Sequence, residues 1–406
     1  MNKTYIPRPK YLETVKPFIG KEIIKVFTGQ RRVGKSCIMA QIADIVGQTD
    51  KKANIIYIDK EKYEFDFIKN YHDLAKYIAS ETKKRTKTYL FIDEVQEIEG
   101  FEKAIRDFAR SGKGDVYISG SNSEILSSDL AGKLSGRYVE IRVHGLSYRE
   151  FLSFHKLEKG TDSLEKYIKY GGLPYLVNLE LNDEQVFGYL KNVFDAVILK
   201  DVVSRYEVRN VNFLGRLIEY LANNLGSLVS AKKISDFLKS QNINLSPNTV
   251  LNYLSFLQSG FFVSKAQRMD VMGKKIFEIG EKYYFEDLGL RHVVVNFKQV
   301  DINKILENLV YSRLINLGYK VFVGQTDKGE IDFVAEAAGE KIYVQVAYLI
   351  SSKKVEKREF GSLLAIKDNY RKYVVTMDKM AAGSVKGVTH LHILDFLLVE
   401  NWGKGK

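Results

Sequence analysis

The sequence predicts an α/β protein in which a parallel sheet covered by helices comes first and a second, smaller α/β region comes last. Three observations support this fold class. Short apolar runs alternate with helical patterns from residue 23 to residue 143. A glycine-containing loop separates the first run from the first helical stretch, and after residue 303 a helical stretch precedes four more strand-like runs. Alternating strands and helices are typical of parallel sheets.

The apolar runs of the first region are rich in isoleucine, valine, tyrosine and phenylalanine, and they do not alternate strictly with polar residues. This composition indicates strands that are buried on both faces of a sheet. The predicted strands are residues 23–29, 54–59, 88–93, 116–121 and 138–143. The predicted helices are residues 36–46, 71–84 and 101–110.

The pattern changes after residue 145. Residues 147–223 have a mostly helical pattern, with a break at YGGLPY (170–175). Residues 225–275 have the pattern of a small helical module followed by strands. The last region begins with a helical stretch at 303 and continues as strands separated by glycine turns. The chain therefore contains more than one folded region.

The composition narrows the class of protein. The 406 residues are 45% hydrophobic, which is enough for two or three domains with their own cores. Cys37 is the only cysteine, so an intramolecular disulfide is excluded, in keeping with a reducing compartment. No apolar stretch reaches the roughly 18 to 20 residues of a membrane-spanning helix, and the first residues lack the apolar core of a signal peptide. We therefore predict a cytoplasmic protein without membrane contact.

Residues 29–36, GQRRVGKS, fit the P-loop pattern G-x-x-x-x-G-K-[ST], with a strand before them and a helix after them. The glycines let backbone N–H groups face phosphates, and the helix N-terminus adds positive potential. Lys35 is expected to reach the β- and γ-phosphates of ATP, and Ser36 to bind Mg²⁺. Cys37 follows and is expected to be a small packed side chain. The predicted nucleotide-binding residues are Gly29, Gln30, Arg31, Arg32, Val33, Gly34, Lys35, Ser36 and Cys37.

Two acidic residues end the strand TYLFID, as expected for a Walker B motif. Asp93 at this position can hold the ligand shell of Mg²⁺. The adjacent Glu94 is placed to polarise a water for attack on the γ-phosphate. The alternative is an ordinary acidic turn after a strand, which the P-loop upstream makes a weaker interpretation.

Two further positions are candidates for the catalytic site. Asn122 follows the strand VYISGS, where a polar side chain can contact the γ-phosphate or the attacking water, although helix capping by a neighbouring serine is the alternative. Arg137 precedes the last strand of the sheet and can act as an arginine finger across a subunit boundary in a homo-oligomer. The alternative for Arg137 is an ordinary salt bridge.

The order of these motifs resembles the AAA+ ATPases. The fragments GQRRVGKS, FIDEVQEI, SGSNSEIL, LSGRYVEI and HGLSYREFL are similar to one prokaryotic branch whose members join an AAA domain to a C-terminal domain of unknown function. The resemblance covers roughly residues 1–200 and implies ATP and Mg²⁺ as cofactors. It also implies that Pro174, in GGLP, contacts adenine from the lid, and that Ile6, Pro7 and Arg8 lie near the base. A simple turn between helices is the alternative for GGLP.

The middle module carries seven basic and two acidic residues between 225 and 275, in a chain whose net charge is +12. Its helix–turn–helix–strand order resembles a winged helix, whose second helix would present Asn248, Asn252 and Tyr253 to duplex DNA. Winged helices also bind proteins, and solvated lysines alone would give the same charge, so both alternatives stay open. The basic residues are Lys232, Lys233, Lys239, Lys265, Arg268, Lys274 and Lys275.

The last region resembles the PD-(D/E)XK nuclease core, with Glu307 on a helix and Asp332 in the strand that follows Glu330. Gln345 replaces the second acid of that motif, and Ala347 replaces its lysine. Because an amide is a weaker metal ligand and alanine cannot stabilise a leaving oxygen, we expect a degenerate nuclease fold. The alternative is an active variant with a displaced lysine such as Lys341.

The leading hypothesis is therefore an AAA+ ATPase whose nucleotide state controls a DNA-binding module and an inactive nuclease-like domain. The first rival is a regulatory switch NTPase that acts on a protein partner, and the second is an ATP-gated nuclease. The predicted regions are an AAA+ P-loop ATPase core (1–145), a helical lid or linker (146–223), a winged-helix-like module (224–300) and a degenerate nuclease-like domain (301–406).

Overall fold

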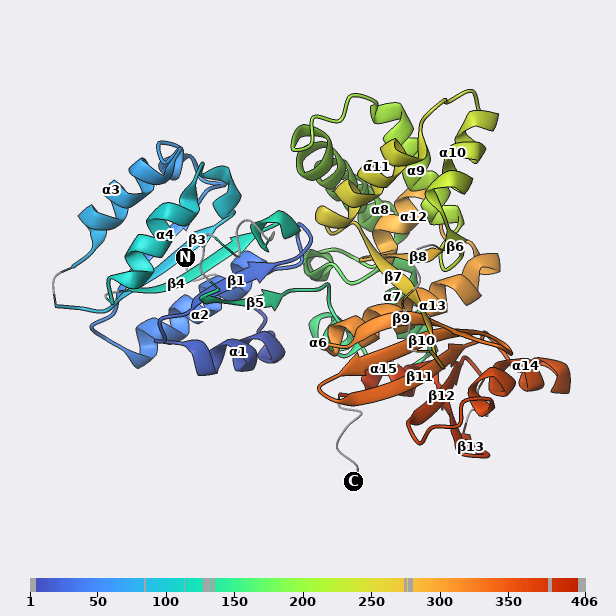
Figure 1. Ribbon diagram of the computed structural model, residues 1–406. Helices are drawn as coiled ribbons and strands as arrows, with labels where there is room; N and C mark the ends of the chain where they lie inside the picture. The colour runs from blue at the N-terminus through green and yellow to red at the C-terminus, as the bar shows by residue number, and fades with distance from the viewer. Residues whose placement is uncertain are drawn as a thin grey trace. The chain divides into compact units, whose positions relative to one another are not determined.

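The computed structural model describes residues 5–83, 85–112, 114–126, 132, 136–273, 276, 280–378 and 382–400. The chain forms two compact units (Figure 1). The first contains Met1–His144 together with Ser259–Phe261, and the second contains Gly145–Gln258 and Phe262–Lys406. In the described part of the chain, no helix is both long and apolar enough to cross a membrane.

A five-stranded parallel sheet in the order β2-β3-β4-β1-β5 forms the centre of the first unit. The predicted parallel α/β architecture of this region is confirmed. β3 and β4 are buried along their whole length, as their apolar composition predicts. The strands are β1 (Ile24–Thr28), β2 (Asn54–Asp59), β3 (Thr88–Asp93), β4 (Gly114–Gly120) and β5 (Tyr138–Arg142).

Among the residues that the structure describes, four α-helices accompany this sheet, and the starts of two follow local sequence signals. Asn70 caps one of them by accepting hydrogen bonds from the N–H groups of His72 and Asp73. Gly34 precedes another in a left-handed conformation, with φ of 96°. The helices are α1 (Pro9–Val15), α2 (Lys35–Thr49), α3 (Tyr71–Glu81) and α4 (Phe101–Arg110). Because the strands are parallel, their carboxyl ends meet at one edge, where β1 leads into α2 and β3 ends at Asp93.

The second unit begins with helices, and the predicted break lies between two of them. Gly171 has φ of 78°, and the N–H of Gly172 donates to the buried Asp287 carboxylate at 2.7 Å. Pro174 then opens the 3₁₀ helix η5 (Pro174–Asn178). The helices of this part are α6 (Tyr148–His155), α7 (Thr161–Tyr170), α8 (Asp183–Ala196), the π-helix η6 (Val197–Ser204), α9 (Val211–Asn223) and α12 (Leu288–Val295).

A nine-stranded mixed sheet in the order β13-β14-β12-β11-β10-β9-β7-β8-β6 completes the second unit. β7 (Val263–Asp270) pairs antiparallel with β8 (Glu281–Phe285) and parallel with β9 (Lys320–Thr326). Strands on both sides of residue 300 therefore belong to one continuous sheet. The others are β6 (Leu228–Val229), β10 (Gly329–Ala337), β11 (Glu340–Val346), β12 (Arg371–Thr376), β13 (Ala382–Val385) and β14 (Val388–His392). The helices are α10 (Ala231–Ser240), α11 (Pro247–Ser259), α13 (Ile302–Asn316), α14 (Lys353–Leu364) and α15 (Ile393–Leu398).

Candidate functional site

The P-loop lies between β1 and α2, and two of its glycines are required by the backbone. Gly29 has φ of 140°, and a Cβ there would lie 2.1 Å from the carbonyl oxygen of Val143. Gly34 has φ of 96° directly before α2. Residues that carry a side chain rarely adopt these backbone conformations. The two glycines therefore allow the loop to turn sharply around the start of the helix.

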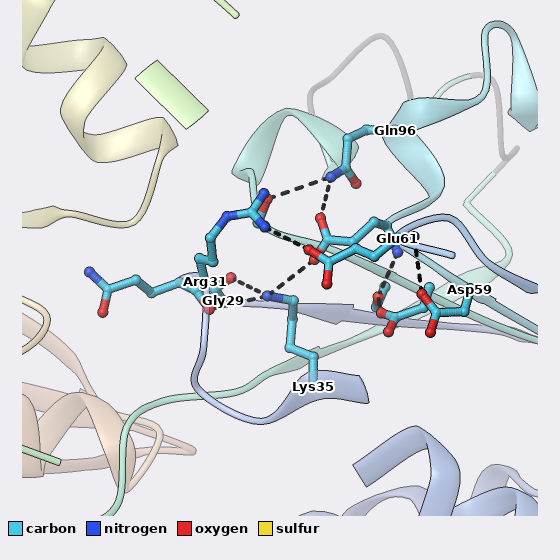
Figure 2. A network of polar contacts seen from close by, with 11 residues as sticks. Gly29, Arg31, Lys35, Asp59, Glu61 and Gln96 are labelled. Carbon is cyan, nitrogen blue, oxygen red and sulfur yellow. Dashed lines mark hydrogen bonds and ion pairs between the residues drawn. The ribbon is translucent and has the colours of Figure 1, made fainter. Parts of the chain in front are cut away.

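Lys35 is buried at the first position of α2, with its ammonium group inside the loop (Figure 2). Its Nζ donates to the carbonyl oxygens of Gly29 at 2.9 Å and Gln30 at 3.1 Å. The same Nζ lies 3.9 Å from Oε1 of Glu94. Neutral carbonyl groups are weaker partners for an ammonium than phosphate oxygens are. The lysine is thus held in place by partners that a nucleotide can replace.

Asp93 ends β3 and contacts two hydroxyl groups. The hydroxyl of Ser119, on β4, donates to its carboxylate, and Ser36 is a second hydrogen-bond partner. Burial raises the pKa of Asp93, and these hydrogen bonds oppose the shift. A carboxylate next to a serine hydroxyl offers the oxygen ligands that Mg²⁺ prefers. Ser36 and Asp93 therefore fit a magnesium ion that is bound together with nucleotide phosphates.

Glu94 is buried and has a left-handed backbone with φ of 54°. Its N–H donates to the hydroxyl of Ser119 at 3.1 Å, and its Oε2 accepts from Nε2 of Gln96 at 2.5 Å. Burial alone would raise the pKa of Glu94, but the cations of Lys35 and Arg31 and the Gln96 hydrogen bond outweigh it and lower the pKa. Glu94 is thus an ionised carboxylate beside the P-loop lysine.

Two arginines contribute to this site in ways that the sequence did not indicate. Arg31 is buried within the P-loop and donates to Oε1 of Glu61 at 2.8 Å (Figure 2). Arg8 is also buried, and its Nη1 donates to the carbonyl oxygens of Val33 at 3.0 Å and His144 at 2.9 Å. The N-terminal segment is therefore attached to the P-loop itself. Neither contact has a local signal, because each joins residues 25 or more positions apart.

Comparisons with known proteins agree with this geometry. A family model described as an AAA domain matches residues 21–152. The chain is 35% identical over 404 residues to an uncharacterized protein of Haemophilus influenzae, covering 98% of this chain and all of the relative. The chain belongs to the AAA+ family of P-loop ATPases. A second model, a domain of unknown function, matches residues 161–301 of this AAA+ protein.

Two further proteins are similar to this AAA+ protein. An uncharacterized protein of Methanocaldococcus jannaschii is 29% identical over 363 residues, which cover 85% of this chain and 79% of the relative. Among solved structures, a Walker-type ATPase of Pyrococcus abyssi matches with a TM-score of 0.52 and 13% identity, over 72% of this chain and 97% of that chain. At 13% identity, the match to the Pyrococcus abyssi structure shows a shared fold alone.

The other residues predicted for the nucleotide site differ in burial and in the unit to which they belong. Asn122 is buried directly after β4, and Arg137 is exposed directly before β5. Cys37 is exposed, so the prediction of a packed side chain is wrong. The reason is that Cys37 lies on the face of α2 opposite to the buried Ile38 and Met39. Pro174 belongs to the second unit, and its contact with adenine stays a prediction.

The helical module of the AAA+ protein contains the predicted helix–turn–helix–strand order as α10, α11 and β7. Tyr253 was expected to face DNA, but it is buried and its ring lies 4.6 Å from that of Phe213. The physical reason is helical periodicity, because Tyr253 shares one face of α11 with Val250 and Leu257. Asn248 and Asn252 are exposed, as predicted.

The basic residues of this module have different surroundings. Lys232, Lys233 and Lys239 are exposed on α10. Lys265 instead pairs with Glu281 at 2.8 Å, and Arg268 donates to Gln325 at 2.7 Å. Lys274 and Lys275 lie outside the described residues. Of the four exposed basic residues that the structure describes in this module, three therefore lie on α10 and one, Lys265, on β7.

The second unit also contains a lysine surrounded by carboxylates. Nζ of Lys282, on β8, lies 2.9 Å from Glu307, 2.7 Å from Glu330 and 3.8 Å from Asp332. Lys341, suggested above as a displaced catalytic lysine, instead pairs with Glu336 at 2.7 Å. Lys282 is thus the lysine that lies in the acidic cluster.

The two residues that differ from the nuclease motif lie beside this cluster. Oε1 of Gln345 accepts from the N–H of Asp332 at 3.3 Å, so the amide is engaged with backbone. Ala347 is buried directly after β11. The resemblance to the nuclease core predicted that Glu307, Glu330, Asp332 and Gln345 lie together. No sequence pattern predicted that Lys282 joins them.

Proposed function

We propose that the first unit hydrolyses ATP with Mg²⁺, using Lys35 for the β- and γ-phosphates and Glu94 to activate water. The observation that carries this proposal is the buried, ionised Glu94 carboxylate 3.9 Å from the Lys35 ammonium. Ser36 and Asp93 would hold Mg²⁺, which supplies charge neutralisation at the phosphates when it is bound.

The test is the variant Glu94→Gln, which keeps the size of the side chain but cannot accept the proton. We expect turnover to fall about 10²- to 10⁴-fold, the usual contribution of a general base, while binding of a fluorescent ATP analogue persists. Glu97→Gln is the matched control, because Glu97 is exposed three positions further along the chain. Wild-type turnover in Glu94→Gln would assign the base elsewhere.

Three residues would complete this site. Asn122 would contact the γ-phosphate or the attacking water, and Pro174 would contact adenine. Arg137, which is exposed, would act on the nucleotide of a neighbouring copy in a homo-oligomer. Mixing Arg137→Ala with Glu94→Gln should then restore some turnover, because some sites would combine an intact base with an intact finger. A monomer without rescue would leave Arg137 as an ordinary surface residue.

We further propose that the nucleotide state controls duplex DNA binding by the α10–α11 module. The exposed Lys232, Lys233 and Lys239, together with the exposed Asn248 and Asn252, support this assignment. Phosphate contacts of this kind make affinity fall with salt, with a slope of about 0.9 per neutralised phosphate. ATP turnover that increases on addition of duplex DNA would support the coupling.

Charge reversal tests the binding surface. We expect Lys232→Glu with Lys233→Glu to weaken DNA binding and flatten its salt dependence. Lys51→Glu with Lys52→Glu is the control, because it makes the same charge change at two exposed, adjacent lysines of the first unit. Failure of the wild type to bind any duplex at low salt would favour a switch that acts on a protein partner.

The nuclease-like region is proposed to be a binding or scaffolding domain that does not cut DNA. Gln345 and Ala347 replace the acid and the lysine of the motif, and Lys282 pairs with the acids that remain. Supercoiled plasmid with Mg²⁺ or Mn²⁺ should therefore stay intact. Cleavage that disappears in Asp332→Ala would establish the gated nuclease instead.

A further inference from the structure

Gln96 is a polar residue of the nucleotide site to which neither the P-loop nor the Walker B pattern gives a role. It lies in the 3₁₀ helix η3 (Val95–Glu97), directly after the left-handed Glu94. Its Nε2 donates to Oε2 of Glu94 at 2.5 Å and lies 3.5 Å from the hydroxyl of Ser121 (Figure 2). The side chain thus connects the carboxyl end of β3 with that of β4.

The backbone leaves space for this amide. Gly120 ends β4, and a Cβ at that position would lie 2.6 Å from Oε1 of Gln96 and 1.6 Å from the side chain of Ile125. Any other residue at position 120 would therefore displace the glutamine or the isoleucine. The glycine permits the Gln96 side chain to lie over the end of the strand.

The second amide atom of Gln96 has an unusual environment. Oε1 is buried, and among the residues that the structure describes it has no hydrogen-bond partner. Buried acceptors of this kind are rare in folded proteins and call for a ligand or a water. Here the acceptor belongs to the same amide whose N–H₂ group binds Glu94. A water between Glu94 and Gln96 would satisfy it.

We propose that Gln96 holds the attacking water together with Glu94, and this inference rests on the ATP hydrolysis proposed above. Nε2 keeps the Glu94 carboxylate in place, and Oε1 accepts a hydrogen bond from one proton of the water. The water oxygen attacks the γ-phosphorus while its other proton passes to Glu94. The bond from the γ-phosphorus to the bridging oxygen breaks, and ADP leaves with that electron pair.

The experiment compares Gln96→Ala with the wild type in the full chain, by steady-state ATP hydrolysis and by binding of a fluorescent ATP analogue. We expect kcat to fall about 10- to 100-fold, as for the loss of one water-orienting group, with affinity for the analogue within about twofold. Gln48→Ala is the control, because Gln48 is exposed on α2.

A second variant tests whether the loss of turnover in Gln96→Ala comes from a folding defect. Gln96→Glu keeps the size of the side chain but loses the N–H donor, so it should lose turnover in the same way. Wild-type kcat in both variants, while Glu94→Gln is inactive, would overturn the role of Gln96 alone. Absence of turnover in the wild type would overturn the proposed hydrolysis and this inference with it.

Discussion

Each unit of the molecule places a buried lysine beside carboxylates, but the two lysines have different partners. Lys35 donates to two neutral carbonyl groups and has one carboxylate at 3.9 Å. Lys282 has two carboxylates at 2.9 and 2.7 Å and a third at 3.8 Å. A phosphate is a better partner than a carbonyl, so it can draw Lys35 away. Nothing comparable is gained when Lys282 leaves its carboxylates.

The pKa shifts of the second cluster agree with a permanent ion pair. Burial alone would lower the pKa of Lys282, but Glu307, Asp332 and Glu330 outweigh it and raise the pKa, so the lysine stays charged. Burial and the charge of Glu307 raise the pKa of Asp332 to about 8, although Lys282 opposes them. Asp332 thus keeps its proton at neutral pH, and Lys282 pairs closely with Glu307 and Glu330. The first cluster is arranged to receive a ligand, and the second is complete by itself.

A large expected effect is on the stability of the second unit. Lys282→Met leaves the partly buried Glu307 and Glu330 without their cation, so we expect the free energy of unfolding to fall. The upper bound is the loss of about 3–5 kcal/mol for a fully buried pair. Urea unfolding of the second unit measures this change. Lys265→Met is the control, because Lys265 pairs with Glu281 nearer the surface and should cost about 1 kcal/mol or less. A loss as small as that of the control would mean that Lys282 is not the counter-ion of the cluster.

For the lysine of the first cluster, Lys35, we expect the main effect on the affinity for ATP. Lys35→Ala removes the cation expected at the β- and γ-phosphates. With about 1.5–3 kcal/mol for each charged hydrogen bond, affinity for ATP should fall about a hundredfold or more. Calorimetric titration with ATP measures the loss, and Lys51→Ala, at an exposed position outside the P-loop, is the control. Unchanged affinity would refute the P-loop assignment.

A further expected effect is a pH dependence that belongs to the second cluster. The pKa of Asp332 is about 8 in the folded chain against 3.8 ordinarily. The folded state therefore binds a proton that the unfolded state releases, and this contribution to stability decreases as pH rises from about 4 to 8. Asp332→Asn should flatten the stability profile in this window, measured by urea unfolding at several pH values. The same slope in both proteins would place the titrating group elsewhere.

Sequence patterns predicted the first unit well because its signals are local. The P-loop and the strand ending at Asp93 lie within short runs of residues. The contacts of Lys282 with Glu307 and Glu330, and that of Gln96 with Ser121, join chain segments that come together only in the fold, so no spacing rule predicts them. Tyr253 is a different case, since its burial follows from the helical period that it shares with Val250. At that position the helical periodicity, and not the resemblance to a DNA-binding helix, predicts the burial.

The continuous sheet of the second unit has a practical consequence for making fragments of this protein. β7 pairs with β9 from Gln267 to Asp270, and β9 begins at Lys320. A recombinant fragment that stops at residue 301 would remove β9 and leave those backbone groups of β7 unpaired. Such an open strand edge recruits other chains and promotes aggregation. A fragment that keeps β9 to β14 would avoid this edge, so expression trials should cut before the helices of the second unit rather than within its sheet.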